Sequence, residues 1–264
     1  MSRLAFIWLL LGTISSSFCA LSRSNLSLRS PPIVYTIAGS DSGGGAGIQA
    51  DLHAIQSMKC HGCSAITCLT AQNSVGVTEV HAPPPAFLRQ QLDTLTADLP
   101  PRAVKIGMLG TVELAKLVGE VLKEMKEKDK TVWVVLDPVM ISTSGAKLID
   151  DDAIDAMIKN VFPVADVVTP NKFEAEALLG RDLKTPGDIE KGAEDLLAMG
   201  CKSVLIKGGH SLTESTTVES PASSEVKATL EYAQDYLLSS ETPPAKGDER
   251  LCDGSTGVWI RTNR

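Results

Sequence analysis

The sequence predicts an α/β fold in which a mostly parallel, doubly wound sheet carries helices on both faces. Short apolar runs that are typical of buried strands alternate along the chain with segments whose apolar residues recur at helical spacing. Such alternation is typical of parallel strands joined by right-handed crossover helices. Aromatic residues make up only 4% of the 264 residues, so the core must consist of Val, Ile, Leu and Ala, which suits strands covered on both faces.

The predicted elements follow one another at short intervals. Strands are expected at residues 33–38, 65–69, 75–80, 104–109, 131–136, 166–169 and 204–206. One helix is expected to begin near residue 48, and further helices are expected at residues 83–98, 112–126, 151–161, 172–179 and 186–199. Residues 210–250 are rich in Ser, Thr, Glu and Pro with little periodicity, which predicts an irregular excursion with one element near residues 230–238.

Several residues lie just past the ends of the predicted strands. They are Gly39, Met108, Asp137, Asn171 and Lys207. Ligands of parallel α/β sheets bind beyond the carboxyl ends of the strands. We therefore expect these residues to form one neighbourhood, although they are far apart in the sequence.

Residues 1–30 are expected to be a targeting segment that precedes a folded domain at residues 31–264. An apolar run at residues 4–11 follows Arg3, and small and polar residues continue to Ala20, as in a signal peptide. Residues 21–30 contain Arg and Ser and no acidic residue, which is typical of a transit peptide. A signal followed by a transit segment resembles the leaders of plastids acquired by secondary endosymbiosis. This predicts a plastid location, with a cytoplasmic or secretory location as the alternative and a disordered tail as the simpler reading.

The composition argues against several classes of partner. The net charge is −7 and no basic stripe interleaved with aromatics is present, so nucleic acid is not expected, whereas a phosphate-bearing ligand remains compatible. The apolar run of the leader is too short to span a membrane, so no membrane partner is expected after its removal. Cys60 and Cys63 form a single C-x-x-C pair, which does not suffice for structural zinc. Cys63, Cys68 and Cys201 are expected to be core residues of a reduced protein.

The glycine-rich stretch at residues 39–47 has five glycines in nine residues. It is not a Walker A loop, because Ala46 rather than Lys follows Gly45. A dinucleotide-binding loop would need an acidic residue about 20 residues further on, and no Asp or Glu occurs between Leu52 and Thr78. The remaining alternatives are a loop that lets a substrate approach the backbone closely and an ordinary tight turn.

Seven segments in order resemble the hydroxymethylpyrimidine and phosphomethylpyrimidine kinases of thiamine biosynthesis, which belong to the ribokinase superfamily. The segments are residues 38–52, 62–67, 71–73, 105–109, 136–140, 169–175 and 207–210. The resemblance implies a ribokinase-like fold. It also implies an ATP-dependent kinase that phosphorylates 4-amino-5-hydroxymethyl-2-methylpyrimidine and then its monophosphate. The alternatives are a pyridoxal-type kinase of the same fold and a non-catalytic pyrimidine-binding protein.

The resemblance assigns roles to individual residues. The implied substrate site consists of Ala38, Gly39, Asp51, Gln72, Met108 and Val139. Asp51 and Gln72 resemble the pair that hydrogen-bonds the amino and ring nitrogens of the pyrimidine, and Met108 and Val139 would pack against the ring. The resemblance also implies Mg²⁺ near Asp137 and Glu174, ATP phosphates near Asn171 and Lys207, and a homodimer.

The late Gly-Thr-Gly-Cys segment of the family, which forms the anion hole and carries the catalytic base, does not occur in this sequence. Residues 251–255 and 259–262 resemble the strands that precede it. The resemblance therefore predicts a C-terminally truncated kinase, whose fold lacks its C-terminal portion and whose base and anion hole would lie beyond Arg264. Loss of one anion-hole donor costs about 10²–10³ in rate, so we expect substrate binding to be better preserved than turnover.

Overall fold

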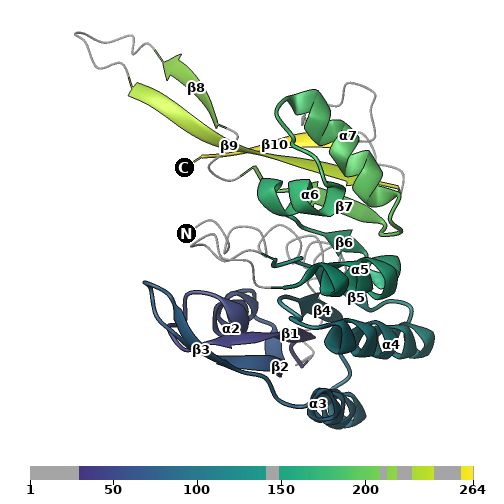
Figure 1. The fold of residues 1–264 in the computed structure, drawn as a ribbon. Helices are drawn as coiled ribbons and strands as arrows, with labels where there is room; N and C mark the ends of the chain where they lie inside the picture. The colour runs from purple at the N-terminus through teal and green to yellow at the C-terminus, as the bar shows by residue number, and fades with distance from the viewer. Residues whose placement is uncertain (1–29, 141–148, 209–212, 219–227, 241–256, 264) are drawn as a thin grey trace, which may run out of the picture. The chain divides into compact units, whose positions relative to one another are not determined.

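The structure is a computed structural model that describes residues 30–140, 149–208, 213–218, 228–240 and 257–263. The predicted leader lies outside the described residues, apart from its last residue. The chain divides into two compact units, Met1–Val164 and Ala165–Arg264. The helices and strands of both units are labelled in Figure 1. The prediction that residues 31–264 form one domain stays a prediction.

The first unit contains a sheet with the strand order β5-β4-β1-β2-β3. Its strands are β1 (Ile33–Asp41), β2 (His61–Gln72), β3 (Val77–His81), β4 (Ala103–Ile106) and β5 (Trp133–Leu136). β1 runs parallel to both β2 and β4, and β4 runs parallel to β5. β3 pairs antiparallel with β2 at the end of this order. The sheet is thus mostly parallel, as the sequence predicts.

The helices of the first unit lie on both faces of this sheet. They are α2 (Gly47–Ser57), α3 (Pro85–Asp98), α4 (Val112–Lys128) and α5 (Asp151–Asn160), followed by the short 3-10 helix η1 (Phe162–Val164). The Thr36 hydroxyl donates to Asp51 of α2, whereas the adjacent Tyr35 hydroxyl donates to the carbonyl of Leu99 at the end of α3. Neighbouring residues of a strand point to opposite faces, so α2 and the end of α3 lie on opposite faces.

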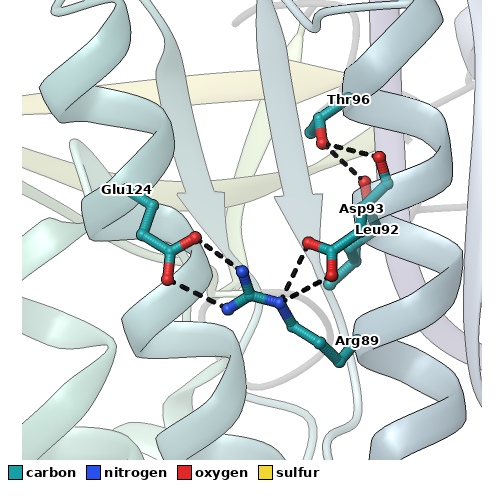
Figure 2. A network of polar contacts seen from close by, with 5 residues as sticks. All are labelled: Arg89, Leu92, Asp93, Thr96 and Glu124. Carbon is teal, nitrogen blue, oxygen red and sulfur yellow. Dashed lines mark hydrogen bonds and ion pairs between the residues drawn. The ribbon is translucent and has the colours of Figure 1, made fainter.

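Helices α3 and α4 are fastened together by an ion-pair network (Figure 2). The guanidinium of Arg89 donates two parallel hydrogen bonds to the carboxylate of Glu124, at 2.8 and 2.9 Å. Its Nε atom also donates to Asp93 one turn further along α3, at 2.9 Å. This contact keeps the pKa of Glu124 below its usual value, because Arg89 stabilises the charged carboxylate. The network is a structural link between two helices rather than a site for chemistry.

The second unit contains one parallel strand pair and an antiparallel group. The strands are β6 (Val167–Val168), β7 (Ser203–Ile206), β8 (Thr213–Val218), β9 (Ala228–Ser239) and β10 (Gly257–Asn263), and the helices are α6 (Lys172–Leu179) and α7 (Pro186–Leu197). β6 and β7 are parallel, and β9 pairs antiparallel with β7, β8 and β10. Trp259 of β10 donates to Glu190 of α7 at 2.9 Å and packs against Tyr236 of β9, so α7 is tied to this sheet.

Most of the predicted elements are present, although several differ in their bounds: β2 spans residues 61–72 rather than 65–69, and β4 ends at Ile106 rather than at Leu109. Residues 213–218 form β8, which was not predicted; its Thr and Val residues favour strands, and its pairing with β9 outweighs the polar composition. The predicted element near residues 230–238 is confirmed within β9. β1 continues to Asp41 rather than ending at Ala38, because Ser40 and Asp41 still pair with β2.

Within the described part of the chain, none of the helices combines the length and apolar character needed to cross a bilayer.

Candidate substrate and phosphate sites

The ends of three parallel strands bring several predicted site residues together in the first unit. The backbone N–H of Gly107, just after β4, donates to the carbonyl of Ile37 at 2.9 Å. The N–H of Asp137, just after β5, donates to Ile106 at 2.9 Å. The predicted residues Ala38, Gly39, Met108, Asp137 and Val139 therefore lie at one edge of the sheet, as expected for residues that follow parallel strands.

Gly39 lies against two side chains at this edge. A methyl group added at Gly39 would lie 2.9 Å from Sγ of Cys68 and 3.4 Å from Cε of Met108. The absence of a side chain therefore lets β1 pass close to both residues. Burial raises the pKa of the Cys68 thiol, so it stays protonated at neutral pH. Cys63, Cys68 and Cys201 are all buried free thiols, which agrees with the predicted core role.

Asp41 organises the glycine-rich loop, residues 42–46. One of its carboxylate oxygens accepts from the N–H of Gly43 and the other from the N–H of Ala46, both at 2.8 Å. Its carbonyl accepts from the N–H of Gly44 at 3.0 Å. The Asp41 side chain is buried, with a residue exposure of 6%. One buried carboxylate thus fixes both ends of the loop.

The loop is also joined to the end of β2. Oγ of Ser42 donates to the carbonyl of Gln72 at 2.6 Å and accepts from the Gln72 N–H at 2.8 Å. Oγ1 of Thr70 donates to the carbonyl of Ser40 at 2.8 Å. Asn73, the next residue, accepts from the N–H groups of the turn that leads into β3. These contacts place Gln72 beside the glycine-rich loop, as the substrate-site prediction requires.

Helix α2 begins directly against the end of β1. Gly47 has φ +58°, and a methyl group added there would lie 2.3 Å from the carbonyl oxygen of Gly39. Only glycine combines this backbone conformation with so close an approach. The loop between β1 and α2 is therefore closed by a backbone contact at its base.

Asp51 of α2 lies in a buried cluster with two residues that were given no role from the sequence. Its Oδ2 atom accepts from Oγ1 of Thr36 at 2.6 Å and from Nζ of Lys105 at 2.8 Å. The side-chain exposures are 7% for Asp51 and 18% for Lys105. A methyl group at Gly107 would lie 3.1 Å from this Nζ atom and 2.9 Å from Cβ of Ala38. Lys105 therefore occupies space that Gly107 leaves open beside Ala38.

In the second unit, Asn171 and Glu174 form a complete capping box at the start of α6. The Asn171 side chain accepts from the Glu174 N–H at 2.9 Å, and the Glu174 carboxylate accepts from the Asn171 N–H at 2.7 Å. Glu174 is almost fully buried, at 1% exposure. Both residues were predicted as site residues, and both are also structural elements of the helix terminus.

Lys207 lies beside this helix terminus. Its N–H donates to Pro170 at 2.8 Å and its carbonyl accepts from Lys172 at 3.1 Å, so the ends of β6 and β7 are joined. The next N–H, that of Gly208, donates to Oδ1 of Asp235 on β9 at 2.9 Å. Burial raises the pKa of Asp235, and the Gly208 bond and the nearby charge of Lys207 partly offset that rise. Asp235 thus supports the turn that carries Lys207.

The predicted neighbourhood is observed as two local groups, one in each unit. Gly39, Met108 and Asp137 meet in the first unit, and Asn171 and Lys207 meet in the second. The sequence reasoning missed the roles of Thr36, Lys105 and Asp235. A signal existed for Lys105, because it is a charged residue inside a strand that is otherwise apolar, and buried charges need partners. Asp235 gave no such signal, because β9 also contains Glu231 and Gln234.

The described residues can be tested for a metal site by their chemistry. Among them, no three His, Cys, Asp or Glu side chains are grouped as a fully protein-bound metal would require. Mg²⁺ usually keeps several waters and takes one or two carboxylates together with substrate phosphates. Single carboxylates such as Asp137 and Glu174 therefore fit Mg²⁺ better than a metal held by protein ligands alone.

A model of the phosphomethylpyrimidine kinase family matches residues 41–240. The hydroxymethylpyrimidine/phosphomethylpyrimidine kinase of Synechococcus elongatus is 46% identical over 178 residues, which cover 67% of this chain and 66% of that protein. The probable thiamine biosynthetic bifunctional enzyme, chloroplastic, of Oryza sativa subsp. japonica is 41% identical over 189 residues, which cover 71% of this chain and 34% of that protein. The chain thus spans about two thirds of the first relative and about one third of the second.

The solved structures that are similar to this chain include two vitamin kinases. A crystal structure of phosphomethylpyrimidine kinase from Clostridium difficile has a TM-score of 0.66 and 38% identity, and the match covers 79% of this chain and 81% of that one. An ADP complex of Bacillus subtilis pyridoxal kinase has a TM-score of 0.67 and 32% identity, and the match covers 88% of this chain and 75% of that one. These similarities confirm the predicted α/β fold with a mostly parallel sheet.

Proposed function

Because this chain belongs to the phosphomethylpyrimidine kinase family, whose fold is ribokinase-like, we propose that it acts in thiamine biosynthesis as an ATP-dependent kinase. The proposed substrates are 4-amino-5-hydroxymethyl-2-methylpyrimidine and its monophosphate. The hydroxymethyl oxygen, and then a phosphate oxygen of the monophosphate, attacks the γ-phosphorus of ATP. ADP leaves in each transfer, and the hydroxyl proton is lost in the first. The products are the monophosphate and the diphosphate of the pyrimidine.

The observation that carries this proposal is the anchored loop of residues 42–46. Asp41 and Ser42 hold it against Gln72, while Gly39 lies against Met108. We propose that the pyrimidine ring packs against Met108 and Val139 beside Ala38 and Gly39. The Gln72 amide and the Asp51 carboxylate then hydrogen-bond its nitrogens. Both bonds that Asp51 receives from Thr36 and Lys105 go to Oδ2, so Oδ1 is the atom proposed to accept from the amino group.

We propose that the phosphates of ATP are bound by Asn171 and Lys207. Asp137 and Glu174 are each proposed as a carboxylate that would contact Mg²⁺. A Lys ammonium offsets phosphate charge, and Mg²⁺, when bound, would supply neutralisation of the charge that develops during transfer. The capping bond from the Asn171 N–H fixes the Glu174 carboxylate at the start of α6. That fixed orientation suits a contact with the metal through a bound water.

The proposal is tested by assaying the full chain for ADP release with ATP, Mg²⁺ and the hydroxymethylpyrimidine. Pyridoxal serves as the competing substrate. Calorimetric titration with the pyrimidine measures binding independently of turnover. Pyrimidine-dependent ADP release supports the kinase. Pyrimidine binding without ADP release supports the alternative of a non-catalytic pyrimidine-binding protein.

The pyridoxal kinase alternative is supported by one specific observation. The similarity to the Bacillus subtilis pyridoxal kinase covers 88% of this chain. The higher sequence identities, however, are to hydroxymethylpyrimidine/phosphomethylpyrimidine kinases. Turnover of pyridoxal in preference to the pyrimidine would favour this alternative.

We also propose that the protein forms a homodimer through the β2–β3 edge of the first unit. All residues of β3 are exposed, and several exposed apolar residues gather on β2, β3 and the turn between them: Leu69, Val75, Val77 and Val80. Exposed apolar patches commonly mark interaction surfaces. Light scattering coupled to size exclusion measures the mass. A Val77→Glu/Val80→Glu variant should shift a dimer toward monomer.

The location of the protein is proposed to be a plastid. The support is the signal-plus-transit character of residues 1–30, together with a relative whose name places it in the chloroplast. A fusion of residues 1–30 to a fluorescent protein tests this proposal. Fluorescence in the secretory pathway or the cytosol would contradict it.

A further inference from the structure

A buried trio of polar residues in the first unit has no role assigned to it as a group. Thr36 and Lys105 lie opposite each other on the paired strands β1 and β4, and both donate to Asp51 of α2. The donor–acceptor distances are 2.6 and 2.8 Å, and both bonds end on Oδ2. Two bonds of different direction to one oxygen fix the rotation of the carboxylate as well as its position.

Burying the charges of Asp51 and Lys105 costs free energy of desolvation, which suggests that the trio has a role besides stability. The side chains of Asp51 and Lys105 are 7% and 18% exposed. Apolar side chains of similar volume often pack as well as a buried ion pair or better, because they need no desolvation of charge. A stabilising role alone therefore does not account for charges at this place, next to Ala38 and Gly107 at the substrate edge of the sheet.

We propose that Thr36 and Lys105 are positioning residues that select a substrate carrying an exocyclic amino group. They hold Oδ2 of Asp51 so that Oδ1 accepts a hydrogen bond from that amino group. The inference rests on the proposed function, because it deepens the recognition of the aminopyrimidine. The trio would then determine substrate specificity. In an analogue with a carbonyl oxygen in place of the amino group, that oxygen would face Oδ1 of Asp51, and neither atom can donate a hydrogen bond.

The experiment compares binding of the 4-amino pyrimidine and its 4-oxo analogue by calorimetry, which does not depend on turnover. Thr36→Val keeps the β-branched shape but removes the hydroxyl that orients Asp51. We expect it to weaken binding of the 4-amino compound about tenfold, as the loss of a hydrogen bond to a charged group does. Binding of the 4-oxo compound should change little, so the selectivity falls.

Two variants serve as controls for this measurement. Thr36→Ser retains a hydroxyl and should restore the selectivity of the wild type. Thr96→Val removes a threonine hydroxyl that bonds to the carbonyl of Leu92 on α3, away from the trio. It should leave the selectivity unchanged, since it tests the general effect of losing a threonine side-chain hydrogen bond.

Lys105 is tested separately because its removal leaves Asp51 buried without its cation. Lys105→Met is expected to lose stability and selectivity together. The double variant Lys105→Met/Asp51→Asn removes both charges and keeps the volume. We expect it to fold and to bind the two compounds with similar affinity.

The outcomes separate this inference from the proposed function. Selective binding by the wild type that is lost in Thr36→Val and regained in Thr36→Ser supports the inference. Selective binding that persists in Thr36→Val and in the double variant overturns it while the proposed function stands. A fall in Thr96→Val equal to that in Thr36→Val also overturns it. A wild-type chain that binds neither compound overturns the proposed function, and the inference with it.

Discussion

The two strand-to-helix junctions that carry the candidate site residues are built in opposite ways. In the described chain, α2 of the first unit begins without a side-chain cap at Ala46, and its loop is held by contacts with distant parts of the sheet. α6 of the second unit begins at a complete capping box formed by Asn171 and Glu174. The first junction therefore depends on tertiary structure, whereas the second satisfies its own helix terminus.

This difference teaches where ligand specificity can be built. A junction that is closed by its own residues has few hydrogen-bonding groups left to vary. A junction held by Asp41, Ser42 and Asp51 exposes a loop whose shape is set by the surrounding sheet. We expect substitutions at the first junction to have large and long-range effects, and those at the second to have moderate and local ones.

The largest effect is expected for Gly47→Ala. The added methyl group meets the Gly39 carbonyl at 2.3 Å while the backbone has φ +58°, so we expect a loss of about 4 kcal/mol in the free energy of unfolding, or loss of folding. Gly44→Ala is the matched control, because Gly44 has φ +76° and its added methyl group would meet no atom within 4 Å. It should cost about 1–2 kcal/mol. Denaturant unfolding measures both, and equal losses would show that the close approach is unimportant.

The next effect is expected for Asn171→Ala. The change removes the acceptor for the Glu174 N–H at the start of α6, and loss of such a cap costs about 1–2 kcal/mol. Asn171→Asp keeps the acceptor and should lose little stability.

Glu174→Gln also preserves the capping box. If Glu174 acts on the metal, Glu174→Gln should lower turnover without lowering stability; full activity would leave it a purely structural residue.

A smaller effect is expected for Asp235, together with a pH dependence. Asp235→Ala removes the acceptor for the Gly208 N–H and should cost about 1 kcal/mol relative to Asp235→Asn, which keeps one. Burial raises the pKa of Asp235 above its usual value of 3.8, so the folded state binds this proton more tightly than the unfolded state. Stability from this group is therefore present below about pH 4 and lost as the pH rises through the raised pKa.

That pH dependence is measured by comparing unfolding of the wild type and Asp235→Asn from acidic to neutral pH. The wild type should lose stability relative to the variant as the pH rises through this window. Parallel curves would show that Asp235 has the same pKa in the folded and unfolded states. Such a result would remove the argument that Asp235 is a half-buried support for the Lys207 turn.

The smallest effect is expected away from both junctions, at Arg89. Arg89→Ala breaks the links to Glu124 and Asp93 between α3 and α4. Partly exposed ion pairs contribute about 0.5–1 kcal/mol, and salt weakens them. Lys184→Ala, in a pair whose side chains are 76% and 70% exposed, should have no measurable effect. A loss at Arg89 that equals the loss at Asn171 would contradict the ranking.

The sequence was sufficient for the parallel part of the fold because apolar periodicity and strand-end residues report directly on buried strands and their edges. It was insufficient for residues 213–218, whose polar composition suggested an excursion. There, pairing with β9 decides the structure, and pairing partners are not visible in local composition. It also placed the end of β1 too early, because the register with β2 extends the strand into Asp41.

The candidate site could be predicted only in part for a similar reason. Ala38, Gly39, Gln72 and Met108 follow from the motif and are found together in the first unit. The partners of Asp51 could not be predicted from the sequence. They are Thr36 and Lys105, which are 69 residues apart in the chain and become neighbours only in the sheet. A lone lysine in the strand of residues 103–106 was the available signal.

The contact between Gly47 and Gly39 has a consequence for engineering of the protein. Because Gly47 lies close to the Gly39 carbonyl, β1 and α2 are held together at the base of the loop. The number of residues in the loop can therefore change without moving β1 or α2. The entropic cost of a longer closed loop grows only slowly with length, and a methyl group added at Gly44 would meet no neighbouring atom within 4 Å. Gly44 and Gly45, which lie between the anchored residues Gly43 and Ala46, are therefore the natural place to insert or exchange sequence when a new substrate range is sought by library selection.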